Sequence, residues 1–321
     1  MPRSGPPPPA LVEGPRVRFL DPPAGLANRD SVRIVLVGDT GERSPERDQV
    51  LSAIAAEEKD LIAVLGDLVY PRAPRCPDGT LTDEARSVLD DRIGTPLGGL
   101  GAPVFLIPGN HDVVRRTRLW TSRELDPAME ACLLAYAKAT PDDEIYQPSR
   151  HYAFQAGPVA LAFVSSSGTF LDGEAADMTA TVFERESGDW NLLLAHDVYR
   201  TYYDKETERH LRDWVAEAEL APDVVGSGHA HLLQMGVYDG VLAITSGGGS
   251  KKRNQPRCDR GFLDQGYCRT GQLFGSRRSF GYAVLDIAPD EALVTFKDQR
   301  GDTLWSCRVR QRGQCDLERQ P

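Results

Sequence analysis

Apolar residues recur along the chain in short runs that predict buried strands. Residues 32–37, 61–65 and 104–107 are mainly aliphatic, and each run ends in a polar loop that contains glycine. Runs of this length are typical of strands inside a sheet. Between the first two runs, apolar residues repeat at helical spacing after a serine and a proline, which predicts a helix over residues 44–58. The alternation of strands and helices indicates an α/β fold.

The second half of the chain is predicted mainly as strands. A helix over residues 127–140 precedes them, and the predicted strands are 152–156, 159–164, 191–194, 224–225, 232–238, 241–245, 282–287, 292–297 and 303–309. Short turns join the last three, which predicts an antiparallel meander. Residues 247–279 are rich in glycine, lysine and arginine but lack apolar periodicity, so they are predicted as one long loop.

One large domain is expected over residues 31–312, with a segment on either side. Residues 1–30 include four consecutive prolines, so this leading segment is expected to be extended and flexible. Residues 313–321 are expected to form a tail. No apolar run reaches the roughly 18 residues that span a bilayer, and the start of the chain lacks the apolar stretch of a secretory signal. No transmembrane segment is therefore predicted.

Charge and cysteine content narrow the classes of function. The 321 residues include 37 Lys and Arg against 47 Asp and Glu, which gives a net charge of −10. An acidic chain repels polyanions on average, so no nucleic-acid partner is expected. Of the six cysteines, Cys258 with Cys268 and Cys307 with Cys315 are close enough in sequence for local disulfides. Composition leaves disulfides and free thiols equally open.

Polar residues stand directly after the predicted buried strands. Five such loops carry two carboxylates, one amide and four imidazoles, namely Asp39, Asp67, Asn110, His111, His196, His229 and His231. The carboxyl ends of strands in an open α/β sheet meet at one edge, so these side chains are expected to lie together. Imidazole mixed with carboxylate and amide oxygen suits Zn, Fe and Mn. The set is too large for one ion that keeps an open position, and it suffices for two.

The ordered motifs D-x-G, GDxxY, GNHD, a single histidine after a strand, and GHxH resemble the calcineurin-like metallophosphoesterases. Gly41 and Tyr70 resemble the purple acid phosphatase branch, and GHAHLLQ, SGGG and the stretch FGYAVLDI…ALVTFKDQRGDTLW resemble the small tartrate-resistant acid phosphatases and their bacterial relatives. The resemblance covers about residues 32–310. It implies a four-layer αββα sandwich of two mixed β-sheets flanked by helices.

The resemblance implies two metal ions that share one carboxylate. Asp39, Tyr70 and His231 would hold the first metal, Asp67 would bridge, and Asn110, His196 and His229 would hold the second. Tyr70 as a phenolate ligand predicts Fe(III) at the first position, because a hard trivalent ion can hold a group whose free pKa is about 10. A divalent Fe, Zn or Mn is expected at the second position.

The implied activity is hydrolysis of phosphomonoesters, carried by small molecules or proteins, by a metal-bound hydroxide with release of inorganic phosphate. His111 is the expected proton donor to the leaving group, and Asp112 is expected to orient it. Mammalian-type relatives carry a second substrate-contacting histidine where this chain has Lys205, and His210 lies further along. Both are candidate substrate-binding residues. The basic cluster at 251–253 is open to two interpretations, contact with an anionic substrate or a solvated loop.

Two other functions remain open: a phosphodiesterase on the same dinuclear core, and a catalytically decayed, metal-dependent binding protein. Gly41 argues against the cyclic nucleotide phosphodiesterases, whose first motif is D-x-H. An intact His111 argues against decay, whereas Lys205 leaves it open. Export is expected, as a periplasmic, secreted or tethered protein whose signal or anchor is missing from this chain, with a cytoplasmic location left open. The oligomeric state is not predicted.

Overall fold

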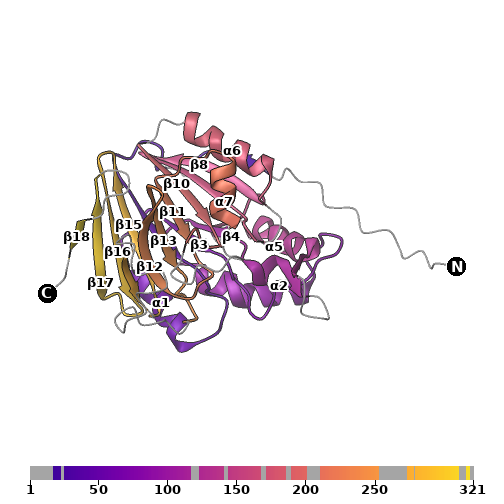
Figure 1. Ribbon diagram of the computed structural model, residues 1–321. Helices are drawn as coiled ribbons and strands as arrows, with labels where there is room; N and C mark the ends of the chain where they lie inside the picture. Colours follow the sequence, from indigo (N-terminus) through magenta and orange to yellow (C-terminus); the bar gives the residue numbers. More distant parts are fainter. Residues whose placement is uncertain are drawn as a thin grey trace, which may run out of the picture.

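Two eight-stranded mixed sheets face each other, and helices cover the outer face of each (Figure 1). The computed structural model describes residues 17–22, 25–116, 123–140, 144–167, 171–185, 189–200, 210–252, 273–277, 279–310 and 316–318. The arrangement confirms the predicted αββα sandwich, in which each sheet buries one face against the other sheet and one face against helices.

The first sheet is built mainly from the second half of the chain. Its strand order is β1 (Val17–Phe19), β8 (His151–Ala156), β9 (Val159–Val164), β10 (Trp190–Ala195), β11 (Val224–Ser227), β13 (Val241–Ser246), β12 (Leu233–Tyr238) and β14 (Leu273–Arg277). Strands β9, β10, β11 and β13 are parallel neighbours, so their carboxyl ends lie at the same edge.

The second sheet combines strands from the first half of the chain with the last strands of the chain. Its strand order is β18 (Asp316–Glu318), β17 (Thr303–Val309), β16 (Glu291–Asp298), β15 (Gly281–Ala288), β2 (Val32–Val37), β3 (Leu61–Leu65), β4 (Val104–Ile107) and β7 (Ile145–Tyr146). Strands β2, β3, β4 and β7 are parallel, and β15 to β18 form an antiparallel meander. A separate ribbon pairs β5 (Val114–Arg116) with β6 (Arg123–Leu125).

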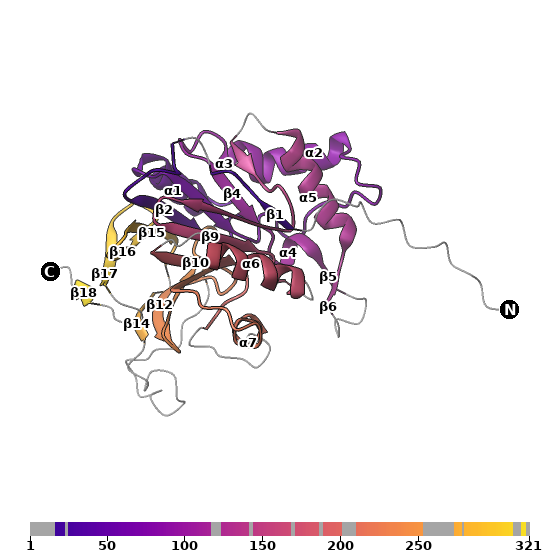
Figure 2. The ribbon, with the colours of Figure 1, turned by 90° about the horizontal axis from the view of Figure 1, so that it is seen from above.

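Three apolar layers hold the sandwich together. Alternate residues of β2 show how: Ile34 and Leu36 face the core between the sheets, whereas Val35 and Val37 face the helices. The helices on that side are α1 (Pro45–Ala56), α2 (Asp83–Leu89), a π-helical turn η1 (Asp90–Gly94), α3 (Thr95–Leu97), α4 (Asn110–Val113) and α5 (Pro127–Ala139). Helices α6 (Gly173–Arg185) and α7 (His210–Glu217) cover the other sheet (Figures 1 and 2). A strand that is buried on both faces reads as a continuous apolar run.

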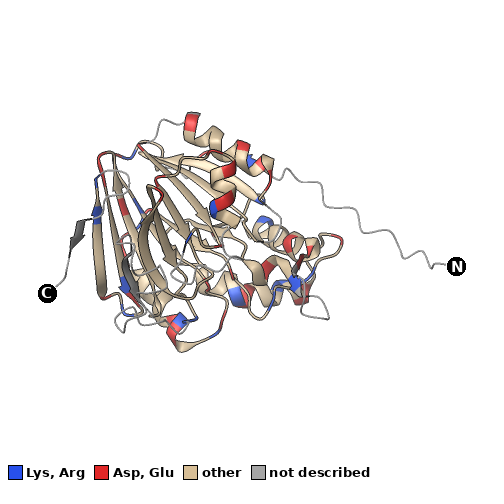
Figure 3. Ribbon diagram, in the orientation of Figure 1, with Lys and Arg blue, Asp and Glu red and all other residues tan. Residues whose placement is uncertain are grey.

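The predicted helix over residues 44–58 is observed as α1. Ser44 caps its start, because its hydroxyl accepts a hydrogen bond from the Arg47 backbone amide at 3.1 Å, and Pro45 occupies the first helical position. Charged residues occur mainly on the helices and the connecting loops, while the central strands are mostly uncharged (Figure 3). No helix in the described residues is long and apolar enough to cross a membrane.

The structure differs from the sequence-based expectation at the margins of the sheets. Residues 17–19, within the segment expected to be flexible, pair with β8, and Leu26 is buried in the inter-sheet core. Residues 273–277, expected to belong to one long loop, form the edge strand β14 beside β12, and residues 316–318 of the expected tail pair with β17. Helices α2, α6 and α7 were also not predicted. Short edge strands are specified by the neighbour they pair with, so their own apolar pattern is weak.

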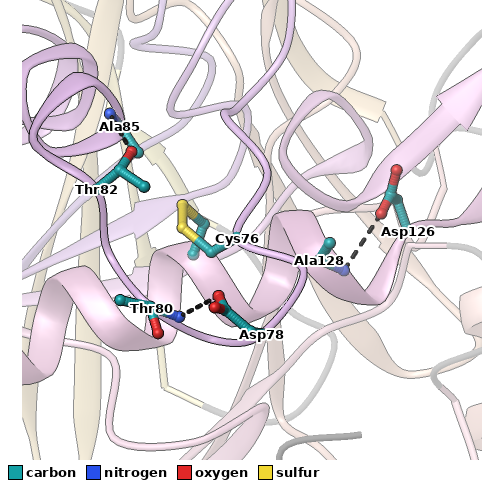
Figure 4. Close-up of a disulfide and its surroundings, with 8 residues drawn as sticks. Cys76, Asp78, Thr80, Thr82, Ala85, Asp126 and Ala128 are labelled. Carbon is teal, nitrogen blue, oxygen red and sulfur yellow. Dashed lines mark hydrogen bonds between the residues drawn. A yellow bond between two sulfur atoms is a disulfide. The ribbon is translucent and has the colours of Figure 1, made fainter. Parts of the chain in front are cut away.

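A disulfide ties the loop after β3 to α5 (Figure 4). Cys76 and Cys132 are both buried, with a Cα–Cα distance of 4.8 Å, and they lie 56 residues apart in sequence. An ion pair between Arg75 and Asp126 at 2.9 Å joins the same two segments. The sequence did not predict this pairing, because nothing in the spacing relates the two cysteines. Cys307 is also disulfide-bonded, with a partner outside the described residues.

The double variant Cys76→Ala with Cys132→Ala is expected to lower the free energy of unfolding. In the chain-entropy model, a crosslink between residues 56 positions apart restricts the unfolded chain and so stabilises the folded protein by about 4 kcal/mol, which the variant loses. Urea unfolding of the variant and the parent protein measures this difference directly. A difference below about 1 kcal/mol would show that the crosslink adds little to the packing that already surrounds it.

Whether Cys258 pairs with Cys268 and Cys307 with Cys315, which the sequence left open, is not tested, because Cys258, Cys268 and Cys315 lie outside the described residues.

Candidate metal centre

The predicted metal ligands follow parallel strands from both sheets. The loops after β2, β3 and β4 carry Asp39, Asp67 and Asn110, and the loops after β10 and β11 carry His196, His229 and His231. Hydrogen bonds join the sheets at this edge. Gly38 donates its backbone amide to the Ser246 carbonyl at 2.7 Å, and His196 Nδ1 lies 2.8 Å from the Leu65 carbonyl. The structure thus brings the ligand loops of both sheets to one place.

Four of these ligands adopt left-handed backbone conformations. The φ angles are 61° at Asp39, 54° at Asp67, 63° at His229 and 53° at His231. Residues with a side chain seldom adopt this region, and where they do the strain is commonly stored at a functional site. The loops also pack closely, because a Cβ added to Gly38 would lie 2.9 Å from the Gly228 Cα. Tight turns at the strand ends therefore point the ligands inward.

One cluster is centred on the phenol of Tyr70. Its Oη lies 2.7 Å from Asp67 Oδ2, 3.1 Å from Asp39 Oδ1 and 3.2 Å from His231 Nε2. A hydroxyl has one hydrogen to donate, so it cannot satisfy both carboxylates at once. Burial, followed by the charges of Asp39 and Asp67, raises the pKa of Tyr70 well above its ordinary value. The phenol stays protonated here unless a cation takes the place of its proton.

The second cluster surrounds His196. Its Nε2 lies 3.2 Å from Asn110 Oδ1, 3.1 Å from His229 Nδ1 and 3.4 Å from Asp67 Oδ1. Burial alone would lower the pKa of His196, but the carboxylates led by Asp67 and Asp39 raise it to about 9. Burial and the neighbouring His196 lower the pKa of His229 to about 4. A neutral His229 and a protonated His196 mean that one positive charge already sits among these acceptors.

The two clusters share the Asp67 carboxylate. One of its oxygens contacts Tyr70 and the other contacts His196, and the latter also accepts a hydrogen bond from the His111 backbone amide at 2.9 Å. Donor atoms of Asp39, Asp67 and His196 lie within 4.8 Å of one another.

Asp39 Oδ2 is buried and has no hydrogen-bond partner. An orphaned carboxylate oxygen among converging acceptors is what a cation site requires. The residues therefore fit metal ions, which the two clusters would hold on either side of Asp67.

Metal binding to this centre is expected to release protons. His196 has a pKa of about 9 and Tyr70 a pKa well above its ordinary value, so both carry a proton near pH 7 that a metal must displace. Apparent metal affinity should consequently rise with pH, and it should rise more steeply below about 9, where His196 also gives up a proton. Titration calorimetry at pH 7 in two buffers of different ionisation enthalpy measures the released protons, and Tyr70→Phe should release fewer. Heats that do not depend on the buffer would contradict this protonation state.

The role predicted for Asp112 is corrected by its contacts. The Asp112 carboxylate is fully buried and accepts hydrogen bonds from the backbone amides of Leu68 and Val69, at 3.0 Å each, and of Gly109, at 2.7 Å. His111 Nδ1 instead lies 2.6 Å from the Pro71 carbonyl, and its ring meets the Tyr70 ring edge-on at 4.5 Å between centroids. Asp112 holds the loops after β3 and β4 together, and Pro71 orients the imidazole.

Of the two candidate substrate-binding residues, the structure describes only His210. Lys205 lies outside the described residues. His210 begins α7, where its Nε2 lies 3.1 Å from Asp197 Oδ2 and 3.2 Å from the Ser166 carbonyl. Asp197 follows the ligand His196 directly, and the sequence analysis missed it, although the AHD triplet placed a third carboxylate next to a ligand. His210 is therefore positioned beside the centre through Asp197.

A family model described as calcineurin-like phosphoesterase matches residues 32–233. Three solved structures resemble the fold: a purple acid phosphatase from yellow lupin (Lupinus luteus) seeds, GAP50 described as the anchor in the inner membrane complex of Plasmodium, and PhoD. Their TM-scores are 0.63, 0.63 and 0.59, with sequence identities of 16%, 13% and 11%. No curated protein matches the chain.

The matches cover 87%, 88% and 92% of this chain, and 54%, 89% and 73% of the three structures in the same order. The chain therefore spans about half the length of the lupin enzyme, and likeness at this level of identity shows the fold alone.

Proposed function

The chain belongs to the calcineurin-like phosphoesterase family, and from this premise we propose that it hydrolyses phosphomonoesters and releases inorganic phosphate. The family and the candidate metal centre together indicate metal-dependent phosphoester hydrolysis. The observation that carries the proposal is the Asp67 carboxylate, which is shared between a phenol cluster and an imidazole cluster. Such sharing is what a two-metal phosphatase needs, because its ions lie close enough to clamp one phosphate.

The chain's own residues would bind the metals and handle the protons. Asp39, Tyr70 and His231 would hold one ion, Asn110, His196 and His229 the other, and Asp67 would contact both. When bound, two metal ions supply Lewis-acid stabilisation of the phosphate charge and activation of a water molecule. The protein prepares this arrangement by excluding water, since Asp39, Asp67 and His196 are buried almost completely.

His111 would give a proton to the departing alcohol oxygen. The contact between Nδ1 and the Pro71 carbonyl fixes the hydrogen on that nitrogen and leaves Nε2 to carry the proton that is transferred. Its backbone amide is anchored to Asp67 Oδ1, so the residue keeps a fixed position relative to the centre. Asp112 maintains this geometry by holding the loops on both sides.

Turnover of two aryl esters tests the proposed activity. The metal-loaded protein is assayed with p-nitrophenyl phosphate and with bis-p-nitrophenyl phosphate from acid to neutral pH. The proposal expects a higher kcat/KM for the monoester. Preference for the diester would indicate a phosphodiesterase on the same core, and bound metal without turnover of either ester would indicate a binding protein.

Fe(III) beside a divalent Fe, Zn or Mn is proposed for the two positions. The support is Tyr70, because a phenol buried against two carboxylates loses its proton only to a strongly charged ion. Phenolate bound to Fe(III) absorbs visible light, so the protein should be coloured and Tyr70→Phe should be colourless. A colourless protein that is fully active with divalent metal alone would contradict this assignment.

Export is proposed as well, and the buried Cys76–Cys132 disulfide supports it, since such bonds persist in oxidising compartments. Cell fractionation of the native host tests the location. Recovery in the periplasm, the medium or the membrane fraction is expected, and recovery in the cytosol would contradict it.

A further inference from the structure

The segment after β13 is fixed to the loop that carries Asp39. The Gly249 amide donates to the Gly38 carbonyl at 3.0 Å, and the Ser250 hydroxyl donates to the Asp39 carbonyl. A side chain at Gly249 would collide with the Gly38 carbonyl oxygen, so only glycine allows this approach. Lys251 follows Ser250 directly. The contacts of Gly249 and Ser250 therefore hold Lys251 beside the metal centre.

The Lys251 ammonium lies over the ring of Tyr70. Its Nζ is 3.4 Å from the ring centroid, and the phenol oxygen of that ring is 2.7 Å from the bridging Asp67 carboxylate. The same ammonium is 3.3 Å from Glu42 Oε2. The Glu42 side chain is 47% exposed, and ion pairs in contact with solvent are weak. Lys251 can therefore exchange Glu42 for a stronger anion without a large cost.

The net charge of the metal-loaded centre would not balance a doubly charged phosphate, so a further cation is needed. One trivalent and one divalent ion, balanced by two carboxylates, one phenolate and the ionised attacking water, would retain a single positive charge, which offsets a diester but not a monoester dianion. A phosphomonoester is close to a dianion at neutral pH, because its second pKa is near 6, whereas a diester carries a single negative charge. The monoester thus needs more positive charge from the protein than the diester does.

We propose that Lys251 binds the phosphate group of the substrate and favours phosphomonoesters over phosphodiesters. Its ammonium would leave Glu42 and donate hydrogen bonds to a phosphate oxygen that is esterified in a diester and free in a monoester. This inference rests on the proposed phosphatase function and assigns a specificity-determining residue to the same site. For Lys251, the inference favours contact with an anionic substrate over a solvated loop, the two interpretations given for the basic cluster at 251–253. Arg253 of that cluster lies outside the described residues.

The adjacent lysine provides a matched control. Lys252 belongs to the same segment, and its Nζ lies 4.6 Å from the ring centroid of Phe280, which is not part of the metal centre. Replacing either lysine by methionine removes one positive charge and keeps a side chain of similar length. The two variants therefore differ in the aromatic ring from which the charge is withdrawn.

The test compares Lys251→Met, Lys251→Arg and Lys252→Met with the parent protein at equal metal content and equal thermal stability. One readout is the Kd of inorganic phosphate from calorimetry, and the other is the ratio of kcat/KM for p-nitrophenyl phosphate to that for bis-p-nitrophenyl phosphate. Lys251→Met should weaken phosphate binding about ten-fold and lower the ratio by a similar factor. Lys251→Arg should retain most of both quantities, and Lys252→Met should leave both within about two-fold.

Equal effects of Lys251→Met and Lys252→Met would overturn the inference, because a general loss of charge would then explain both. A parent protein that turns over neither ester would overturn the proposed function. In that case the phosphate titration still decides on Lys251, since it measures binding without turnover.

Discussion

Replacing Asp67 with asparagine is expected to reduce phosphomonoester turnover by at least about a thousand-fold, which corresponds to roughly 4 kcal/mol of transition-state stabilisation. The carboxylate contacts both the Tyr70 cluster and the His196 cluster. An amide has one oxygen and no charge, so it cannot bridge two cations. The variant should bind fewer metal ions per chain and lose activity together with them.

The matched control for this variant is Asp302→Asn, which makes the same chemical change at an aspartate whose side chain is 74% exposed in a turn. It should keep the metal content and the kcat of the parent protein. Metal analysis of both variants, beside their kcat/KM for p-nitrophenyl phosphate, measures the difference. An Asp67→Asn protein with full metal content and at least a tenth of the parent activity would refute the bridging role.

The second large effect is expected from His111→Gln. Loss of a general acid lowers the rate by roughly 10² to 10⁴, and the loss depends on the leaving group. An alkoxide needs the proton far more than p-nitrophenolate does, so kcat should fall more steeply for an alkyl phosphate than for p-nitrophenyl phosphate. Metal content should not change, because the His111 side chain contacts Pro71 and Tyr70 and is not a predicted ligand.

Comparing the two substrates separates a proton donor from a structural residue. A general loss of folding or of metal would reduce both rates by the same factor. Equal losses for the alkyl and the aryl phosphate would therefore show that His111 positions its neighbours and does not deliver the proton.

The interior of the fold was predictable from the sequence because its strands are buried on both faces. The first and last residues predicted for β2, β3 and β4 agree with the structure, because the polar loops on either side of each apolar run mark where the strand begins and ends. The edge strands β1, β14 and β18 were missed, because hydrogen bonds to a neighbour specify them more than apolar patterning does. A local sequence pattern does not specify which strands pair with each other.

The convergence of the candidate metal ligands was predictable for a related reason. Each ligand loop follows a buried strand, and the strands of each sheet are parallel where the ligands lie, so the order of motifs is enough to bring the side chains together. Side-chain direction was not predictable in the same way. Asp112 follows His111 directly but points to the amides of Leu68 and Gly109, because neighbouring residues in a helical turn face different directions.

Contacts between distant segments lay beyond the sequence patterns. The partner of Cys76 is 56 residues away, and Lys251 reaches Tyr70 because a glycine-rich segment lies flat against the loop of Asp39. These contacts depend on how the loops pack once the sheets have formed. Both of them join the loop that contains Tyr70 to another part of the fold.

The proposed phosphoester hydrolysis requires two metal ions at one centre. The most direct measurement removes metal with a chelator, adds it back in steps, and records bound metal per chain together with turnover of p-nitrophenyl phosphate. Activity should be absent from the metal-free protein and should reach its maximum at two ions per chain. Turnover that persists without metal, or that is complete with one ion, would contradict a dinuclear centre bridged by Asp67.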